Sequence, residues 1–207
     1  MTIEQEVSGE LPNYLFAVVA DSDPRSQVTT AKTIRFIAPS PNWNIQKVRN
    51  YEELFDKSLH GDVAGGSKLV VLDDDYTTDW EQWVFSETER GDQMVNMLLR
   101  RGMSKNVANQ YTRPESVNFA AALRLFGYDQ KIIIVSNKPP SESMIETIEK
   151  KLRLPKLIDG ISLKGYRSRL MHTVYRQKTP DGIKLVHMSL EGDLTDSLSW
   201  LLPKVLG

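Results

Sequence analysis

Cysteine is absent from this sequence, and histidine is scarce. Without thiols the chain can form no disulfide, perform no thiol catalysis and build no cysteine-ligated zinc or iron–sulfur site. The three histidines, His60, His172 and His187, lack the mutual spacing of metal ligands. These absences exclude thiol chemistry and leave the histidines without a predicted role.

Long apolar runs and an excess of one charge are also missing. No run approaches the roughly 20 residues of a membrane span, and 26 basic residues stand against 27 acidic ones. Such a balance argues against broad electrostatic binding to nucleic acid or to an anionic membrane. Residues 1–12 are polar and acidic and lack the plan of a signal peptide. We therefore expect a cytoplasmic protein that binds neither nucleic acid nor membrane.

What the sequence does contain is an alternation of apolar runs with segments of helical periodicity. The run 15–20, stopped by acid and proline, is typical of a strand buried on both faces. Asp23 and Asn50 are suited to cap the helices that follow them. The alternation predicts an α/β fold, a parallel sheet with helices on both sides. The predicted strands are 15–20, 43–48, 68–74, 131–137 and 159–165, and the predicted helices are 24–38, 50–59, 115–127, 140–154 and 166–177. After these we expect a strand at 182–190 and a helix at 194–206, which Pro203 is a candidate to shorten.

Charged and hydroxyl side chains follow these strands. Asp21 and Asp23 come after the first, Asp73 to Asp75 after the third, Ser136 after the fourth and Lys164 after the fifth. In parallel sheets the groups that act lie at the carboxyl ends of the strands, so these side chains are expected at one edge. Several carboxylates placed together repel unless a cation neutralises them.

This combination suits phosphoryl chemistry. Mg²⁺ is commonly coordinated by one or two carboxylates together with waters and phosphate oxygens. An aspartate beside the ion can attack phosphorus to form an aspartyl phosphate. A lysine and a hydroxyl on neighbouring strands would supply a positive charge and a hydrogen-bond donor to the phosphoryl oxygens.

At these residues the chain resembles the receiver domains of two-component response regulators. FAVVADSDPRS is similar to the family's first strand, LVVLDD to its third, IIIVSN to its fourth and GISLKG to its fifth. The resemblance covers residues 14–177. It implies a flavodoxin-like, doubly wound, parallel five-stranded sheet of order 2-1-3-4-5.

The resemblance also implies a role for each strand-end residue. Asp73 would be the phosphorylated aspartate, and Mg²⁺ would be held by Asp21, Asp23, Asp73 and Asp75, the last chiefly through its backbone carbonyl. Ser136 and Lys164 would bind the phosphoryl oxygens. A histidine kinase or phosphotransfer protein would supply the phosphoryl group, a homodimer is compatible with the resemblance, and the chain would be a phosphoacceptor rather than a turnover enzyme.

The sequence departs from the family pattern at several places. Ser22 separates Asp21 from Asp23, and Gly165 stands where a proline normally follows the lysine. Ile161 occupies the position of the usual switch aromatic. The separation of Asp73 and Ser136 is about twice what receivers need, so residues 77–115 are interpreted as an inserted helical segment. The expected organisation is a tail (1–12), a receiver-like domain (13–177, with 77–115 inserted) and a C-terminal strand–helix extension (178–207).

Two other interpretations stay open. The chain could be a degenerate receiver that is never phosphorylated and serves as an interaction module. It could also be a phosphatase of the haloacid dehalogenase type, because LDDDYT resembles that family's nucleophile motif, with Asp73 as nucleophile, IVSNKP its second motif and GDLTD its late acidic motif. Against the phosphatase, two strand–helix units precede Asp73, and Asp21 is left without a role.

The predicted insertion combines large apolar residues with arginines. Such a mixture suits a partner-binding surface, so we expect a downstream protein to bind residues 77–115. The alternative is that these apolar groups fold back and enlarge the core. The residues concerned are Trp80, Trp83, Phe85, Met94, Met97, Leu98, Leu99, Arg100 and Arg101.

Overall fold

Seven strands and seven helices occur in the part of the chain that the computed structural model describes. That part comprises residues 15–37, 43–61, 66–74, 84–85, 87–136, 140–163, 170–180, 182–191 and 194–207. The strands are β1 Leu15–Ala20, β2 Trp43–Val48, β3 Leu69–Asp73, β4 Lys131–Ser136, β5 Gly160–Leu163, β6 Leu170–Thr179 and β7 Gly182–Glu191. The helices are α1 Pro24–Ile37, α2 Tyr51–Leu59, α3 Glu89–Arg100, α4 Lys105–Gln110, α5 Ser116–Leu125, α6 Glu142–Leu152 and α7 Leu194–Leu206.

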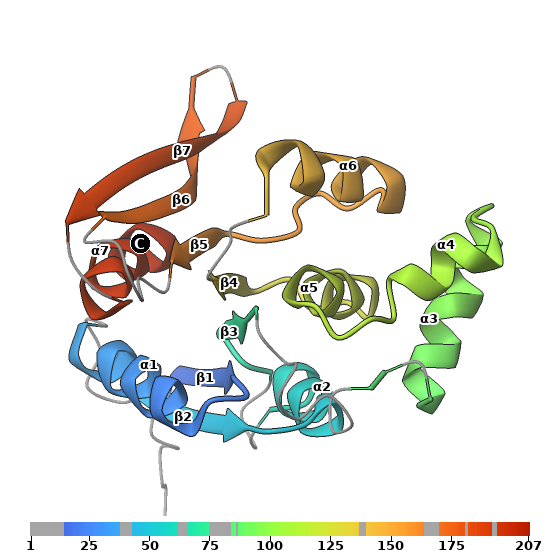
Figure 1. Ribbon diagram of the computed structural model, residues 1–207, viewed down its shortest axis with the longest axis horizontal. Coiled ribbons are helices and arrows are strands. Elements are labelled where there is room, and N and C mark those ends of the chain that lie inside the picture. Colours follow the sequence, from blue (N-terminus) through green and yellow to red (C-terminus); the bar gives the residue numbers. More distant parts are fainter. Residues whose placement is uncertain are drawn as a thin grey trace, which may run out of the picture.

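All seven strands form one sheet of order β2-β1-β3-β4-β5-β6-β7 (Figure 1). Neighbours from β2 to β5 are parallel, whereas β6 is antiparallel to both β5 and β7. The α/β class and the mostly parallel sheet are as predicted. The prediction of a five-stranded sheet is wrong, because two antiparallel strands extend the sheet beyond β5 and change its complete order.

Residues 170–177 were predicted to be helical, and this is wrong: they lie in β6. The register pairs Thr179 with Gly182, so only Pro180 and Asp181 connect β6 to β7. The sequence around this turn, TPDG, has proline, aspartate and glycine in the order that a tight turn favours. The sequence therefore contained a hairpin signal. Pairing at ten positions between β6 and β7 stabilises the strand more than the helical spacing of apolar residues stabilises a helix. The boundary proposed between residues 177 and 178 falls inside β6.

The central strands alternate strictly between two apolar faces, as a sheet buried on both sides requires. One face, called here the α5 face, packs with α2, α3, α5 and α6. The other, called the α1–α7 face, packs with α1 and α7 (Figure 1). On the α5 face lie Phe16, Val18, Ala20, Val70, Leu72, Ile132 and Ile134. On the α1–α7 face lie Ala17, Val19, Leu69, Val71, Ile133 and Val135.

Helix α7 closes the α1–α7 face and is attached to β5 and β6. The hydroxyls of Ser162 and Ser197 are 2.5 Å apart and both residues are fully buried. The rings of Tyr175 and Trp200 meet edge to face, with centroids 5.2 Å apart. The helix continues through Pro203, so the expectation that this residue shortens it is wrong.

The described part of residues 77–115 contains α3 and α4, and its apolar side chains join the core of the α5 face. Phe85, Met94 and Leu98 are completely buried. Gly91 lies so close to Phe85 that an added Cβ would be 1.8 Å from the Phe85 carbonyl oxygen. Of the residues proposed as an exposed surface, these three instead enlarge the core, while Trp80 and Trp83 lie outside the described residues.

Candidate functional site

Asp21 and Asp73 lie next to each other at the carboxyl ends of two neighbouring strands. Strand β1 is parallel to β3 with Ala20 opposite Leu72, so the next residue of each strand is an aspartate. Each aspartate is only 3% exposed. The Asp21 carboxylate accepts a hydrogen bond from the Asp23 amide and the Asp73 carboxylate one from the Asp74 amide, both of 2.8 Å. Side-chain alternation places both acids on the α1–α7 side of the strand ends.

Asp23 has a separate structural task at the start of α1. Its carboxylate accepts a 3.0 Å hydrogen bond from the Arg25 amide, which confirms it as a capping residue. Four residues on, the buried amide of Gln27 donates to the carbonyls of Val19 and Val48. Gln27 thereby holds together the ends of β1 and β2 beside Asp21.

Ser136 ends β4 and points to the α5 face. The register places Val135 opposite Asp73, so Ser136 lies beside Asp74. Its hydroxyl donates to the Asp74 carboxylate, and the Ser116 hydroxyl donates to the other oxygen of the same carboxylate at 2.8 Å. The structure therefore joins Ser136 directly to Asp74, an acid for which the sequence predicted no individual role.

Two of the predicted site residues cannot be placed. Asp75 follows the last described residue after β3, and Lys164 follows β5; both lie outside the described residues. Within the described ranges, no group of three or more acidic or histidine side chains is arranged to hold a metal ion. Mg²⁺ is usually bound through one or two carboxylates together with waters and phosphate oxygens, and Asp21 and Asp73 are two carboxylates on neighbouring strand ends.

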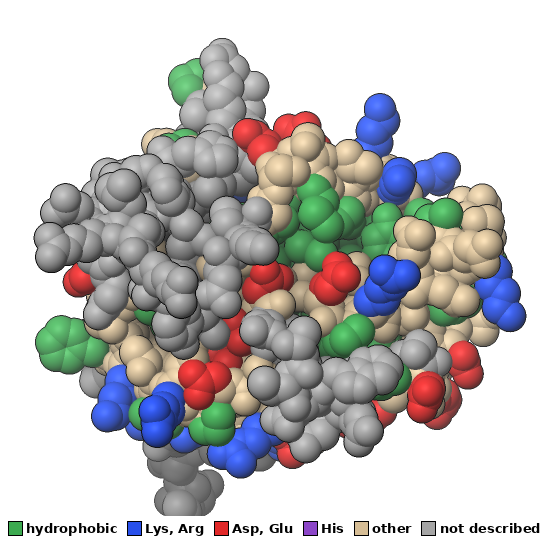
Figure 2. All heavy atoms as spheres, in the orientation of Figure 1, with side chains coloured by type: hydrophobic (Ala, Val, Ile, Leu, Met, Phe, Trp, Pro, Cys, Tyr) green, Lys and Arg blue, Asp and Glu red, His purple; other side chains and the backbone are tan. Residues whose placement is uncertain are grey.

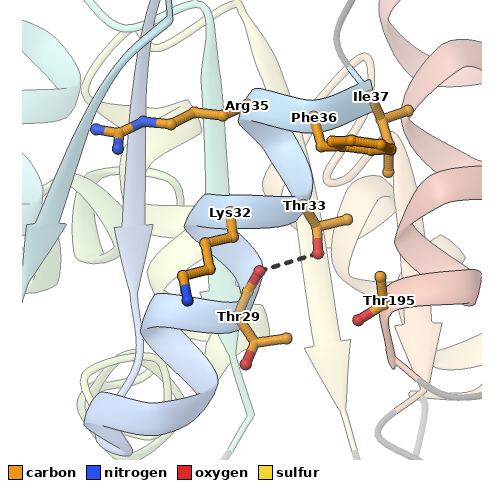
Figure 3. Close-up of a pocket in the computed structure, with 7 residues that line it drawn as sticks. All are labelled: Thr29, Lys32, Thr33, Arg35, Phe36, Ile37 and Thr195. Atoms are coloured by element: carbon orange, nitrogen blue, oxygen red, sulfur yellow. Dashed lines mark hydrogen bonds between the residues drawn. The ribbon is translucent and has the colours of Figure 1, made fainter.

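Acidic side chains are visible near the middle of the face shown in Figure 2, in the region where β3 and β4 lie in Figure 1. A separate cavity of about 600 Å³ lies along α1, lined by α1 residues and Thr195 of α7 (Figure 3). Phe36, which is 92% exposed, forms part of its wall. None of the predicted site residues lines this cavity, so it is not part of the aspartate site.

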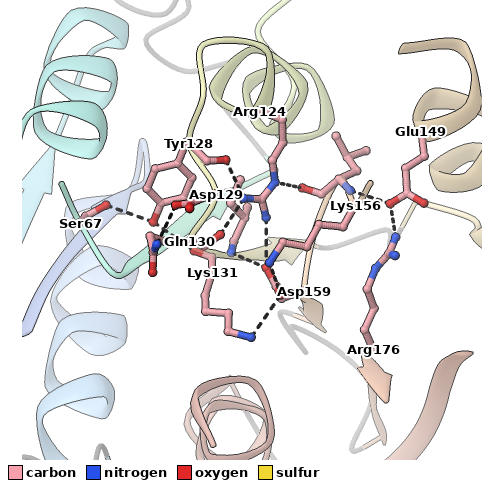
Figure 4. Close-up of polar contacts among 12 residues, drawn as sticks. Ser67, Arg124, Tyr128, Asp129, Gln130, Lys131, Glu149, Lys156, Asp159 and Arg176 are labelled. Atoms are coloured by element: carbon pink, nitrogen blue, oxygen red, sulfur yellow. Dashed lines mark hydrogen bonds and ion pairs between the residues drawn. The ribbon is translucent and has the colours of Figure 1, made fainter. Parts of the chain in front are cut away.

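At the opposite end of the parallel strands, beside the starts of β4 and β5, the structure contains a buried ion pair that sequence reasoning missed (Figure 4). The guanidinium of Arg124 lies 3.1 Å from the Asp159 carboxylate, and both side chains are less than one tenth exposed. Asp159 also accepts a 3.0 Å hydrogen bond from the Ile132 amide. Burial lowers the pKa of Arg124, and the neighbouring Asp159 charge opposes that shift. The available signal was a single arginine inside the apolar helix FAAALRLF.

Among the described residues, no helix has both the length and the apolar character needed to cross a bilayer.

No family model matches the chain, and no curated protein matches it. Among solved structures, it is similar to the signal receiver domain of a NarL response regulator from Mycobacterium tuberculosis, with 12% identity and a TM-score of 0.35. That similarity covers 68% of this chain and 79% of the other. At these values the likeness carries no argument about family or activity.

Proposed function

We propose that this protein is a receiver-like signalling protein that is phosphorylated on Asp73 in a Mg²⁺-dependent reaction. The observation that carries the proposal is the placement of Asp21 directly beside Asp73, both nearly buried, at the carboxyl ends of parallel strands. Two carboxylates placed together favour the binding of a divalent cation, which offsets their mutual repulsion. Asp21 and Asp73 would hold the ion, with Asp23 and Asp75 as further contributors.

The phosphoryl oxygens would be bound by Ser136 and Lys164. A hydroxyl and an ammonium group can donate hydrogen bonds to an anion, and the lysine also offsets its charge. Ser136 ends β4, the strand that pairs with β3, and the sequence places Lys164 directly after β5, the next strand. A histidine kinase or a phosphotransfer protein would be the phosphoryl donor.

The test is to incubate the protein with acetyl phosphate and Mg²⁺ and to measure its intact mass. We expect one phosphoryl adduct on the wild-type chain and none on Asp73→Asn, because the asparagine amide is not a nucleophile for phosphorus. Asp129→Asn, which changes an exposed acid elsewhere, serves as the matched control and should retain the adduct. Removing Mg²⁺ with a chelator should abolish the adduct as well.

Three other results would contradict the proposal. If the wild-type chain forms no adduct, the degenerate receiver that acts only as an interaction module is favoured. An adduct that persists in Asp73→Asn would show that Asp73 is not the phosphoryl acceptor. Continuous hydrolysis of phosphate esters, lost in Asp73→Asn, would favour the phosphatase. Strand–helix units β1–α1 and β2–α2 precede Asp73 in the structure, as the argument against the phosphatase requires.

Output is proposed to run through a protein partner that binds the outer side of α3. That side carries Leu99, which is 37% exposed, beside the exposed Arg100, while the opposite side of the helix is buried. We expect Leu99→Asp and Arg100→Glu each to lower partner capture from a lysate of the source cells several-fold. The control is Lys32→Glu on α1, an exposed charge reversal on the far face of the sheet. If all variants unfold at the wild-type denaturant midpoint and capture the same proteins equally, α3 is not the output surface.

A further inference from the structure

We propose that Asp74 couples Ser136 to the first turn of α5 and thereby passes the state of the Asp73 site to the connection between α4 and α5. The part that concerns Asp73 rests on the proposed function. The coupling itself rests on hydrogen bonds between described residues and can be tested without phosphorylation.

The Asp74 carboxylate is shared between two buried hydroxyls. Ser136 donates to one of its oxygens and Ser116 donates to the other at 2.8 Å. Both serines are 0% exposed, and Asp74 itself is half-buried. Hydrogen bonds to a charged acceptor in such a site are stronger than neutral ones. Asp74 therefore connects the end of β4 to the start of α5 through two charge-assisted contacts.

The Ser136 hydroxyl cannot donate a hydrogen bond to Asp74 and to a phosphoryl group at the same time. A serine hydroxyl has one hydrogen and donates one hydrogen bond. In the structure that bond goes to Asp74, on the α5 side of the sheet, whereas Asp73 belongs to the other side by the alternation of β3. A phosphoryl group on Asp73 that recruits Ser136 would take one of the two hydroxyl partners from Asp74. The added negative charge would also repel the neighbouring Asp74 carboxylate.

The first turn of α5 would register this change. Ser116 is the first residue of α5, and the preceding Glu115 provides no side-chain cap, so the hydroxyl bond to Asp74 is an important attachment of this helix end. Two residues further on, the side-chain amide of Asn118 donates to the backbone carbonyls of Gln110 and Arg113. A shift of the helix start would therefore move the segment that joins α4 to α5.

The segment between α4 and α5 borders an open cavity, so a movement of this segment would change a surface of the protein. Gln110, Arg113 and Asn118 line a cavity of about 490 Å³ together with residues of α6. The same Asn118 that fixes the α4–α5 connection thus forms part of the wall. Movement of the α5 start would change the shape of this wall without any direct contact to Asp73.

The first experiment measures hydrogen exchange in the unmodified protein. The backbone amides of Asn118 and Phe119 both donate to the Glu115 carbonyl at 3.0 Å, so the exchange rates of these two backbone amides report on the first turn of α5. We expect Ser136→Ala to raise their exchange rates several-fold in the wild-type background and to have no further effect in Asp74→Ala. Ser162→Ala, which removes another buried serine hydroxyl on the α1–α7 side, is the matched control and should leave these two amides unchanged.

The second experiment adds beryllium fluoride and Mg²⁺ as a phosphoryl mimic. We expect the Asn118 and Phe119 amides to respond in the wild-type chain and not in Asp74→Ala, although the adduct forms on both. If Ser136→Ala leaves these amides unchanged, or changes them equally with and without Asp74, the coupling is overturned. If no adduct forms on the wild-type chain, the proposed function fails, and the first experiment alone still decides whether Asp74 couples Ser136 to α5.

Discussion

Replacing Asp159 with alanine is expected to reduce the free energy of unfolding by about 3–5 kcal/mol, because it leaves a buried charge without its partner. The Arg124 side chain is 4% exposed and would keep its positive charge in a region closed to water. The Ile132 amide, which now donates to Asp159, would lose its acceptor as well. Urea unfolding followed by circular dichroism measures the loss directly, provided that the dependence on urea concentration stays unchanged.

Two comparisons separate this explanation from a general effect of removing acid. Asp129→Ala changes an exposed aspartate nearby and should alter stability by less than about 0.5 kcal/mol. The double variant Arg124→Met with Asp159→Ala should lose less free energy of unfolding than the sum of the two single losses. With both charged groups removed, no buried charge is left without a partner. Additive losses would show that Asp159 acts by packing and not through Arg124. Lys131, whose side chain is 41% exposed, is expected to contribute little to the pair, because water screens its charge.

Replacing Phe85 with alanine is expected to cost a similar amount, about 3–5 kcal/mol, for the different reason that it opens a cavity in an aromatic cluster. The Phe85 ring stacks on Tyr51 with centroids 4.2 Å apart and lies within 6.2 Å of Phe119. Burial also raises the pKa of the Tyr51 hydroxyl, because the charged phenolate is disfavoured away from water. The loss is measured by urea unfolding.

The matched control is Leu99→Ala, which removes a partly exposed apolar side chain of α3 and should cost well under half as much. Hydrogen exchange adds a test of where the loss acts. We expect faster exchange in α3 of the Phe85→Ala protein, because Phe85 packs against Gly91 at the start of that helix. A Phe85→Ala protein as stable as the wild type would mean that this part of residues 77–115 is not integrated into the core. The interpretation of the region as an independent binding surface would then regain its support.

Local sequence patterns were sufficient for the central sheet and several helix starts. The runs that became β1, β3 and β4 consist mainly of apolar residues, many of them β-branched, and such short runs favour a strand covered on both faces. Asn50 was identified as a cap, and its side chain accepts a 2.8 Å hydrogen bond from the Glu53 amide. The alternation of these elements was also enough to place Asp21 and Asp73 at one edge of the sheet.

Tertiary contacts decided the features that local pattern could not. Residues 170–177 carry a helical stripe, but pairing with β7 and with the edge of β5 makes them a strand. Ser136 was assigned to Asp73 from its place after a strand, whereas the register between β3 and β4 puts it beside Asp74. Sequence order shows that a residue ends a strand but not how neighbouring strands are aligned, and a shift of one residue moves a side chain to the opposite face. The two serine partners of Asp74 and the carboxylate partner of Arg124 are more than 30 residues away along the chain, so only the packed structure could reveal them.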